Sequence, residues 1–485
     1  MDDLPPGCFT APLQVRPTRA VLAYTGRRLS THAPLVTLET VSNNARAIVA
    51  LSGAYLLGLA ATVAVLFSAQ LHFVAFDSSD LLFAHYRLPQ AHELALALGA
   101  ASLAWFAIFV TVVVLFLRKN VVANGQRIGL LVAGQFLLGC AFTLMPIAVD
   151  SDQYAYAEYA YVASHGNPYS PGRLPTSAPS SDRQIALHWG NPPPPDAYGG
   201  AWTAFNAWLL APFENASVRV QVLALRFAAL IAACLTTLLI AASSRNKFAV
   251  AVAFALNPLV FLEVANGAHN DIFLVLGGCA AAWAALRHRF TVAAILVALA
   301  SAVKFSYAPL IAPLLAFAYR RAPSLENIVM PAAAFVATIA LFTVPFGWRH
   351  GPLSAVFGLV EHSKGTFARL TPLASIALVA ALAALTVEAA RGYLSSRLLI
   401  VAALLMLALP GKIEPWYPLM TAPLLIIPLK SAQTAFLGFS ALGMVLVQAS
   451  FLGEFPLVEG FAAALATVCV CVAVFTTNNV RKAIT

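Results

Sequence analysis

The stretch DSDQYAYAEYAYVASHGNPYSPG, residues 150–172, follows directly on an apolar run at 128–149 and precedes a loop rich in proline. The apolar run is close to the roughly 20 residues that a helix needs to cross a bilayer. Two acids and a series of tyrosines stand where this run ends. The junction predicts a transmembrane helix whose end carries either a solvated edge or a functional site.

The composition of the whole chain is that of a membrane protein. Of its 485 residues, 60% are hydrophobic and 10% are charged, whereas soluble domains carry roughly 25% charged residues. The mean hydropathy is +0.80. Because a helix satisfies its own backbone hydrogen bonds inside lipid, the composition predicts an all-α polytopic membrane protein.

Fourteen apolar segments are visible along the chain, and several are shorter than a perpendicular span requires. The pair 290–303 and 305–319 could form one broken or re-entrant helix instead of two spans. We therefore predict about 11–14 transmembrane helices in one domain at 48–485, after a flexible cytoplasmic tail at 1–47. The segments are 48–74, 92–117, 128–149, 218–242, 248–264, 272–286, 290–303, 305–319, 327–345, 371–390, 397–410, 416–429, 432–452 and 457–476.

The distribution of charge predicts the orientation of the chain. When the segments alternate across the membrane, most of the 29 Lys and Arg residues fall on the side of the N-terminal tail, and most of the 20 Asp and Glu residues fall on the other side. By the positive-inside rule, both termini are expected in the cytoplasm. The large loop at 150–216 is then outside. The net charge of +9 reflects this orientation and predicts no nucleic-acid partner.

Ionisable residues gather at the outer ends of the segments, where charge is costly and indicates function. They are Asp150, Asp152, Glu263, His269, Asp271, Lys304, Lys412 and Glu414. A carboxylate can take the proton of an acceptor hydroxyl, and cations or N–H donors can stabilise a leaving phosphate. Because no nucleotide sugar is expected outside the cytoplasm, these groups fit sugar transfer from a lipid-linked donor.

Five sequence elements resemble, in order, those of the polyprenol-phosphate-mannose-dependent α-(1→6)-mannopyranosyltransferases of the GT-C superfamily. The elements are SDQYAYAEYAYVASHGNPYSPG, AYGGAWTAF, NPLVFLEVANGAHND, ASAVKFSYAPLIAPLL and LPGKIEPWYPLM, within about 140–430. The resemblance implies a GT-C-like helix bundle and a hexosyltransferase activity. The expected reaction transfers mannose, with inversion, from a polyprenyl-phosphate donor to an envelope glycan or glycolipid. The expected location is the outer face of a bacterial inner membrane, among its lipids.

The resemblance also assigns roles by position. Asp152 is implied as the catalytic carboxylate, with Asp150 as a second candidate. The residues expected near the donor phosphate are His269, Asn270, Lys304 and Lys412. The residues expected near sugar or lipid are Tyr154, Tyr156, Asn167, Tyr169, Tyr198, Trp202, Glu263, Asp271, Glu414, Trp416 and Tyr417. Two departures from the family pattern are Gly200 in place of a usual proline and an aspartate at position 150 in an element that starts Ser-Arg-Asp in the family.

Each role has a plain structural alternative. Tyr154, Tyr156, Tyr159 and Tyr161 would also suit an aromatic belt at headgroup depth, and we favour this interpretation. Asp271 would suit a helix N-cap. Lys304 would suit a snorkelling lysine. Glu263 needs a buried partner, with Arg226 and Lys304 as candidates.

A different function also stays open, because Glu263 and Lys304 lie within apolar surroundings. Intramembrane polar residues on broken helices are typical of transporters, so a transporter or flippase of lipid-linked sugars is the alternative. Neither function requires a cofactor. Five of the six cysteines lie in apolar runs, which argues against a zinc site. A divalent metal shared by Asp150 and Asp152 is the one metal site that the sequence leaves open.

Overall fold

The computed structural model describes residues 50, 52–64, 73–75, 84–86, 91–119, 125–145, 152–243, 247–347, 351–352, 371–392, 396–408, 414–427 and 430–452. All of them belong to one unit of the chain, residues 49–485. The predicted tail at 1–47, the predicted segment at 457–476, Asp150 and Lys412 lie outside the described residues.

Within this described part, four helices are long and apolar enough to cross a membrane. They are α2 (Ala91–Lys119), α3 (Gly125–Thr143), α7 (Val218–Ser243) and α12 (Glu326–Thr343), which continues into η6 (Val344–Phe346). A fifth candidate is a bent pair, α8 (Lys247–Ala255) and η4 (Val260–Asn266), whose two parts differ in direction by 58°. Pro258 lies in the break and lacks the N–H that a continuous helix would use.

Further helices, whose described apolar stretches have 10–17 residues, complete the bundle. They are Ser52–Ala64, α9 (Asp271–Leu286), α10 (Phe290–Val303), α14 (Thr371–Ala390), α15 (Ser396–Ala408) and α16 (Lys430–Leu452). Two three-residue strands, β1 (Phe73–Ala75) and β2 (Ala84–Tyr86), pair antiparallel. The protein is therefore an all-α polytopic membrane protein, as predicted.

The predicted break between 303 and 305 is present. Lys304 has an extended backbone, with φ −153° and ψ 126°, and separates α10 from η5 (Phe305–Leu310). The chain then continues as α11 (Ile311–Arg321), which packs against α12 and α14. Because the helix is interrupted at Lys304, its side chain points away from the helix face and can reach Asp271.

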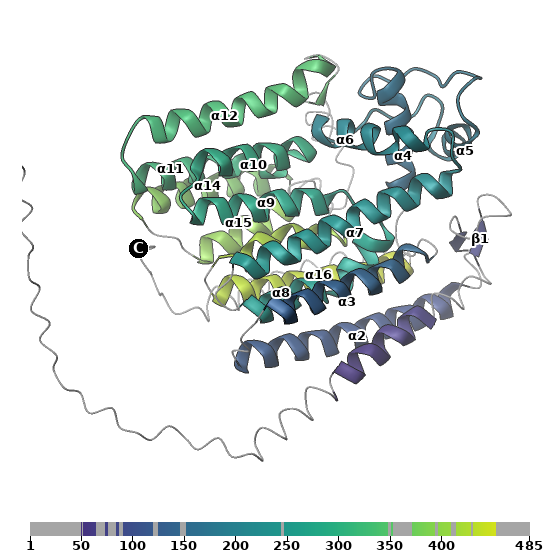
Figure 1. Cartoon of the computed structure of the whole chain (residues 1–485), viewed down its shortest axis with the longest axis horizontal. Helices are drawn as coiled ribbons and strands as arrows, with labels where there is room; N and C mark the ends of the chain where they lie inside the picture. The colour runs from purple at the N-terminus through teal and green to yellow at the C-terminus, as the bar shows by residue number, and fades with distance from the viewer. Residues whose placement is uncertain are drawn as a thin grey trace, which may run out of the picture. The chain divides into compact units, whose positions relative to one another are not determined.

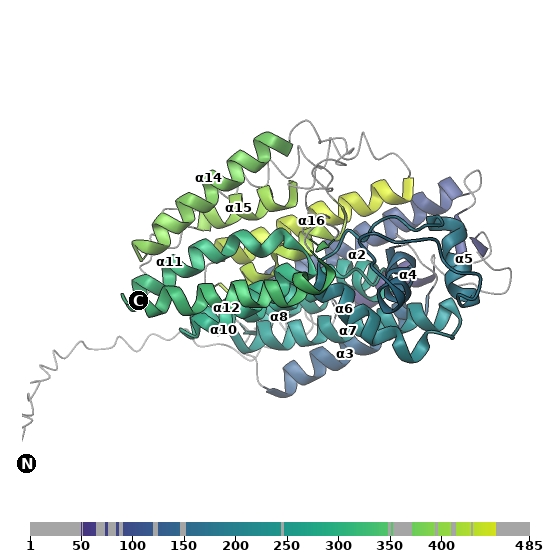
Figure 2. The same cartoon turned by 90° about the horizontal axis from the view of Figure 1, so that it is seen from above.

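The large loop folds into short helices at one end of the bundle, where α4 (Asp152–His165), α5 (Ser180–Trp189) and α6 (Gly200–Leu210) lie together in both views (Figures 1 and 2). A short turn, η3 (Ala211–Phe213), leads from α6 towards α7. Every residue of α4 from Gln153 to Val162 is buried. The first residue of α4 is therefore fixed by packing on several sides.

An aromatic cluster fixes η4 against the neighbouring helices. The Trp105 ring stacks on Phe142 and contacts Phe261, with centroid separations of 5.8 Å in both cases. All three side chains are fully buried. Because aromatic side chains each bury a large area, this contact holds α2, α3 and η4 together. It sets the position of the chain that leads from η4 to His269.

Candidate active site

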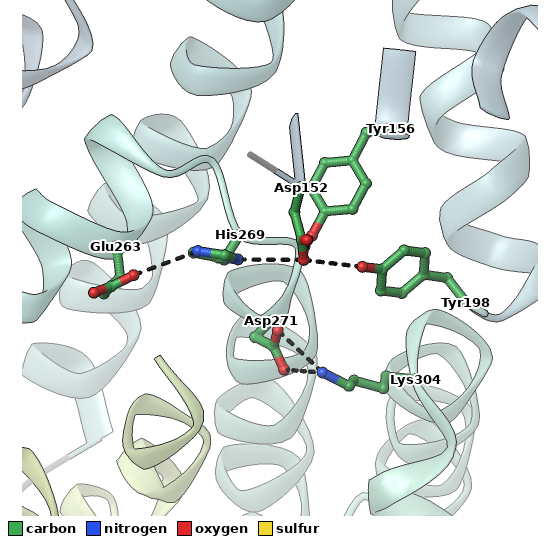
Figure 3. A network of polar contacts seen from close by, with 7 residues as sticks. All are labelled: Asp152, Tyr156, Tyr198, Glu263, His269, Asp271 and Lys304. Carbon is green, nitrogen blue, oxygen red and sulfur yellow. Dashed lines mark hydrogen bonds and ion pairs between the residues drawn. The ribbon is translucent and has the colours of Figure 1, made fainter. Parts of the chain in front are cut away.

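Asp152, the first residue of α4, lies at the centre of a polar network (Figure 3). Its Oδ2 atom accepts a hydrogen bond from the Tyr198 hydroxyl at 3.1 Å and from the Tyr156 hydroxyl at 3.4 Å. The Nδ1 atom of His269 lies 3.8 Å from the same oxygen. The Asp152 side chain is 21% exposed, so one side of the carboxylate stays open to a ligand.

Local geometry explains both tyrosine contacts. Tyr156 follows Asp152 by four residues and therefore lies on the same face of α4. Tyr198 is held from behind by Asp196, whose Oδ1 accepts the Tyr198 backbone N–H at 2.9 Å. The Tyr169 hydroxyl donates to the Tyr198 carbonyl at 3.0 Å, and Thr203 donates to Asp196 at 2.8 Å. The Tyr198 hydroxyl is thus aimed at Asp152 by its own backbone contacts.

Two glycines place α6 next to Lys304. A Cβ atom on Gly199 would collide with the Ala302 carbonyl at the end of α10, and one on Gly200 would collide with the Phe342 carbonyl of α12. The Gly199 N–H donates to the Val303 carbonyl at 2.9 Å. The departure from the family pattern at Gly200 therefore has a structural reason, since only glycine allows this approach.

His269 lies between two carboxylates. Its Nε2 atom is 3.3 Å from Glu263 Oε2, and both side chains are fully buried. The ring stacks on Trp416 at a centroid distance of 3.5 Å. The preceding residue, Ala268, has a φ of 54°, an uncommon value for a residue with a side chain that marks strain near functional sites. Burial, and then the charge of Lys304, hold the pKa of His269 well below its usual range. This shift favours the neutral form of the imidazole.

Lys304 and Asp271 form an ion pair beside Asp152. The Nζ atom lies 2.9 Å from Oδ1 and 3.2 Å from Oδ2 of Asp271, and it also lies 4.3 Å from the centre of the Tyr417 ring. Tyr417 begins η8 (Tyr417–Leu425). The side chains of Lys304 and Asp271 are 17% and 3% exposed, so the pair is largely shielded from solvent.

The electrostatic environment suits Asp152 to exchange a proton. Burial raises the pKa of the Asp152 carboxyl above its usual range. The hydrogen bond from Tyr198 and the charge of Lys304 lower it in part, and the charge of Asp271 raises it. General bases work best when burial and neighbouring charges tune their pKa towards the working pH. A shifted carboxyl with convergent polar neighbours is typical of an active site.

Comparison with known protein families decides the assignment. The family model described as "Alpha-(1->6)-mannopyranosyltransferase, N-terminal domain" matches residues 53–321, which is more than half of the chain. The chain belongs to this alpha-(1->6)-mannopyranosyltransferase family. The resemblance read from the motifs is thus confirmed, and the protein is a mannosyltransferase with a sugar donor and a glycan acceptor. Neither curated proteins nor solved structures provided a match.

Most of the site residues predicted for this mannosyltransferase meet in one place. Figure 3 shows one chain of contacts through Glu263, His269, Asp152, Tyr156 and Tyr198, with the separate Asp271–Lys304 pair beside it. Trp416 and Tyr417 join through His269 and Lys304. Glu263 is paired with His269, whereas the sequence suggested Arg226 or Lys304 as its partner. Asp271 meets Lys304 and makes no side-chain N-cap bond. The Lys304 ammonium is held by that pair and does not snorkel.

Other predicted residues support the site from a distance. Trp202 is buried and packs edge-on against Tyr156 at 5.1 Å between ring centres. Asn167 Oδ1 accepts the Tyr169 N–H at 3.0 Å, which forms the turn before Tyr169. The Glu414 carbonyl accepts the Tyr417 N–H at 3.1 Å. The expected role of these three residues in sugar or lipid binding stays a prediction.

The tyrosine series is not an aromatic belt, and that interpretation was wrong. Tyr154, Tyr156, Tyr159 and Tyr161 are all buried, with exposures of 3%, 0%, 6% and 8%. They pack inside the folded loop because alanines between them allow α6 and α7 to approach α4. Headgroup anchors would need to face the membrane surface.

Sequence reasoning missed two groups of the mannosyltransferase that shape the site. Asp196 lies in the proline-rich WGNPPPPDAYGG and was not singled out, although an aspartate in a loop often forms an Asx turn with the backbone N–H two residues on. Burial raises the pKa of Asp196 to about 7, against the hydrogen bonds from Tyr198 and Thr203. Gln153, beside the proposed base, was also missed. It faces Arg226.

The one metal site that the sequence leaves open, between Asp150 and Asp152, includes a residue outside the described ranges. Among the residues that the structure describes, no three His, Cys, Asp or Glu side chains are grouped so that they could hold a metal ion. Asp150 is not among those residues, so a metal shared by Asp150 and Asp152 stays untested.

Replacing Tyr198 by phenylalanine should shift the acid limb of the mannosyltransferase pH profile to higher pH. The Tyr198 hydroxyl stabilises the ionised form of Asp152, so its loss raises the pKa of that carboxyl further. If Asp152 is the catalytic base, it works when ionised, and activity should fall more at low pH than at high pH. Tyr161→Phe is the matched control, because Tyr161 lies on α4 with Asp152 but stacks on His165 instead. A profile that stays in place in Tyr198→Phe would contradict the assignment of the base.

Proposed function

We propose that the protein is a GT-C-type inverting mannosyltransferase that uses a polyprenyl-phosphate mannose donor and acts on the extracytoplasmic face of a bacterial inner membrane. The observation that carries this proposal is the Asp152 carboxylate, held by two tyrosine hydroxyls and open on one side, beside the Lys304 ammonium. A base and a phosphate-binding cation in one network are the two groups that this transfer needs. The positive-inside bias of the sequence supports cytoplasmic N- and C-termini.

In this mechanism, Asp152 takes the proton of the acceptor hydroxyl as the oxygen attacks the anomeric carbon. The C–O bond to the phosphate breaks on the opposite face, so the configuration inverts. The electron pair of the broken bond stays on the lipid phosphate, and the acceptor proton stays on Asp152 until solvent removes it. General base catalysis of this kind is worth about 10²–10⁴-fold.

The role proposed for His269 differs from the contact with the donor phosphate that the sequence suggested. A neutral imidazole has one N–H and one lone pair. If the proton is on Nε2, which lies 3.3 Å from Glu263, the Nδ1 lone pair faces Asp152 at 3.8 Å. A small approach of the protonated Asp152 carboxyl would then let Nδ1 accept a hydrogen bond from it. His269 and Glu263 thus support the protonated form of the base.

The leaving phosphate would lie against Lys304 and Asn270. Both polar atoms of the Asn270 side chain are buried and, among the described residues, have no hydrogen-bond partner. Asn270 is also the residue at the N-terminus of α9, a helix of 16 residues. Helix N-termini attract anions because their N–H groups are free and the helix dipole is positive there.

An apolar cavity supports a lipid-linked donor. It has a volume of about 200 Å³ and lies between α9, α10, α11, α14, α15 and η8. Tyr307 and Met420 line this cavity and follow Lys304 and Tyr417 by three residues each, so the cavity and the ion pair are close along the chain. The Tyr307 hydroxyl donates to the Met420 carbonyl and so joins two of the segments that line the cavity. The first isoprene units of the donor would enter here while the phosphate stays at Lys304.

The deciding experiment is transfer by purified protein in lipid bilayers, with an α-(1→6)-linked mannose disaccharide as acceptor. We expect a mannosylated product from β-linked polyprenyl-phosphate mannose and none from GDP-mannose, as measured by mass spectrometry. The new linkage should be α by NMR, because inversion changes the anomer. A product formed from GDP-mannose alone would refute the lipid donor, and a β-linked product would refute inversion.

The rival function, a transporter or flippase of lipid-linked sugars, predicts a different result. Labelled polyprenyl-phosphate mannose would cross the bilayer without appearing in any glycan. The cluster of Glu263, His269 and Asp152 does not favour it, because a carboxylate aimed at an open position is not needed for passage. Transport without product, in the same vesicles, would support the rival.

A further inference from the structure

Arg226 is a fully buried cation in the first third of α7, a candidate membrane-spanning helix, outside the network of Figure 3. Charged side chains at this depth are costly and indicate a function. Among the described carboxylates, none forms an ion pair with it within 4.0 Å. The positive charge of its guanidinium is therefore balanced by hydrogen bonds to neutral groups. These groups show which segments of the chain Arg226 holds together.

The partners of Arg226 lie on either side of Asp152 in the sequence. The Nη1 atom donates to the Thr143 carbonyl at 2.8 Å and to the Met145 carbonyl at 2.7 Å. These carbonyls stand at the C-terminal end of α3, where helix carbonyls lack partners and the helix dipole is negative. The Nε atom donates to Gln153 Oε1 at 2.9 Å, on the residue next to the base.

A second side chain holds the same end of α3 from another direction. Asn266, the last residue of η4, donates from Nδ2 to the Phe142 carbonyl at 3.0 Å and to the Met145 carbonyl at 3.4 Å. The same π-helical turn carries Glu263. The end of α3, the start of α4 and the turn that holds Glu263 are thus joined around one guanidinium.

We propose that Arg226 is a positioning residue that sets the direction of the Asp152 carboxylate through Gln153. Arginine suits this task because its planar fork carries donors in fixed directions, whereas lysine offers one compact ammonium. The inference rests on the proposed role of Asp152 as the base. Misplacement of a reacting group by about 1 Å can cost 10²-fold in rate. The expected signature is a loss in kcat with little change in the KM for the donor.

The test uses Gln153→Leu, which removes the link to α4 and leaves the bonds from Arg226 to α3. We expect kcat to fall about 10–100-fold, with the donor KM within about twofold. The matched control is Thr237→Val. Thr237 joins the same two helices, α7 and α3, through a bond to Gln135 at 2.7 Å. The control should keep the wild-type kcat. An equal loss in the control would mean that the helix contact, and not positioning, explains the effect.

Two further variants keep the proposal falsifiable if Gln153→Leu folds poorly. Arg226→Met with Gln153→Leu removes the buried charge altogether, and its kcat should equal that of Arg226→Met alone, because the two residues act as one link. Arg226→Lys should not rescue kcat. Additive losses, or full rescue by lysine, would overturn the proposal. Inactive Asp152→Asn together with fully active Gln153→Leu would reject the positioning role and leave the base in place.

Discussion

Replacing Asp152 by asparagine is expected to lower kcat by about 10²–10⁴-fold while the protein stays folded. Asparagine has nearly the same shape, and its amide oxygen can still accept the hydrogen bonds from Tyr198 and Tyr156. What it lacks is the capacity to take a proton. Initial rates at saturating donor and acceptor, measured in bilayers, provide the comparison, and thermal unfolding in the same detergent checks the fold.

The control for this variant is Glu214→Gln, which removes another carboxylate from the same loop. Glu214 is 34% exposed and pairs with His165, apart from the Asp152 network. Its loss should leave kcat within about twofold of the wild type, since exposed ion pairs contribute little. Near-normal transfer by Asp152→Asn would refute the base and with it the proposed mechanism.

Replacing Lys304 by methionine is expected to have two separate effects. It removes the cation from the leaving phosphate, for which we expect a fall in kcat of about 10²–10³-fold. It also leaves Asp271 buried without its partner, which typically costs about 3–5 kcal/mol in free energy of unfolding. The first effect is measured as a rate and the second as a shift in the unfolding midpoint.

The double variant Lys304→Met with Asp271→Asn separates these effects. Removing both charges should restore most of the stability, because no buried charge is left without a partner. The rate should stay low, because the phosphate still lacks its cation. Recovery of the rate together with the stability would show that Lys304 is a structural residue only.

The bundle could be predicted largely from apolar runs. The run at 218–242 became α7 (Val218–Ser243), and the run at 371–390 became α14 (Thr371–Ala390). The run at 416–429 was misleading, since it forms the 3-10 helix η8 (Tyr417–Leu425) and is too short to cross a bilayer. Pro418 and Pro423 lie within it and remove N–H groups that an α-helix would use.

The site could be predicted only in part. The sequence named the members, because charges beside apolar runs are rare and the motifs follow a known order. It did not predict which members pair, since Glu263 and His269 or Asp271 and Lys304 meet through the packing of separate helices. The tyrosines of α4 were misjudged for a similar reason. Their spacing covers several faces of the helix, so only the neighbouring helices decide which faces are buried.

The two glycines at the start of α6, Gly199 and Gly200, connect the residues around Asp152 to a helix that faces the lipid. Only 11% of the apolar window of α12 is buried among the described residues, so we expect bilayer thickness to act on the tilt of this helix. The Phe342 carbonyl of α12 faces Gly200 with no side chain between them. A change in tilt would therefore reach the backbone of Tyr198, two residues away. We expect membrane thickness to affect the rate of this transferase for that reason.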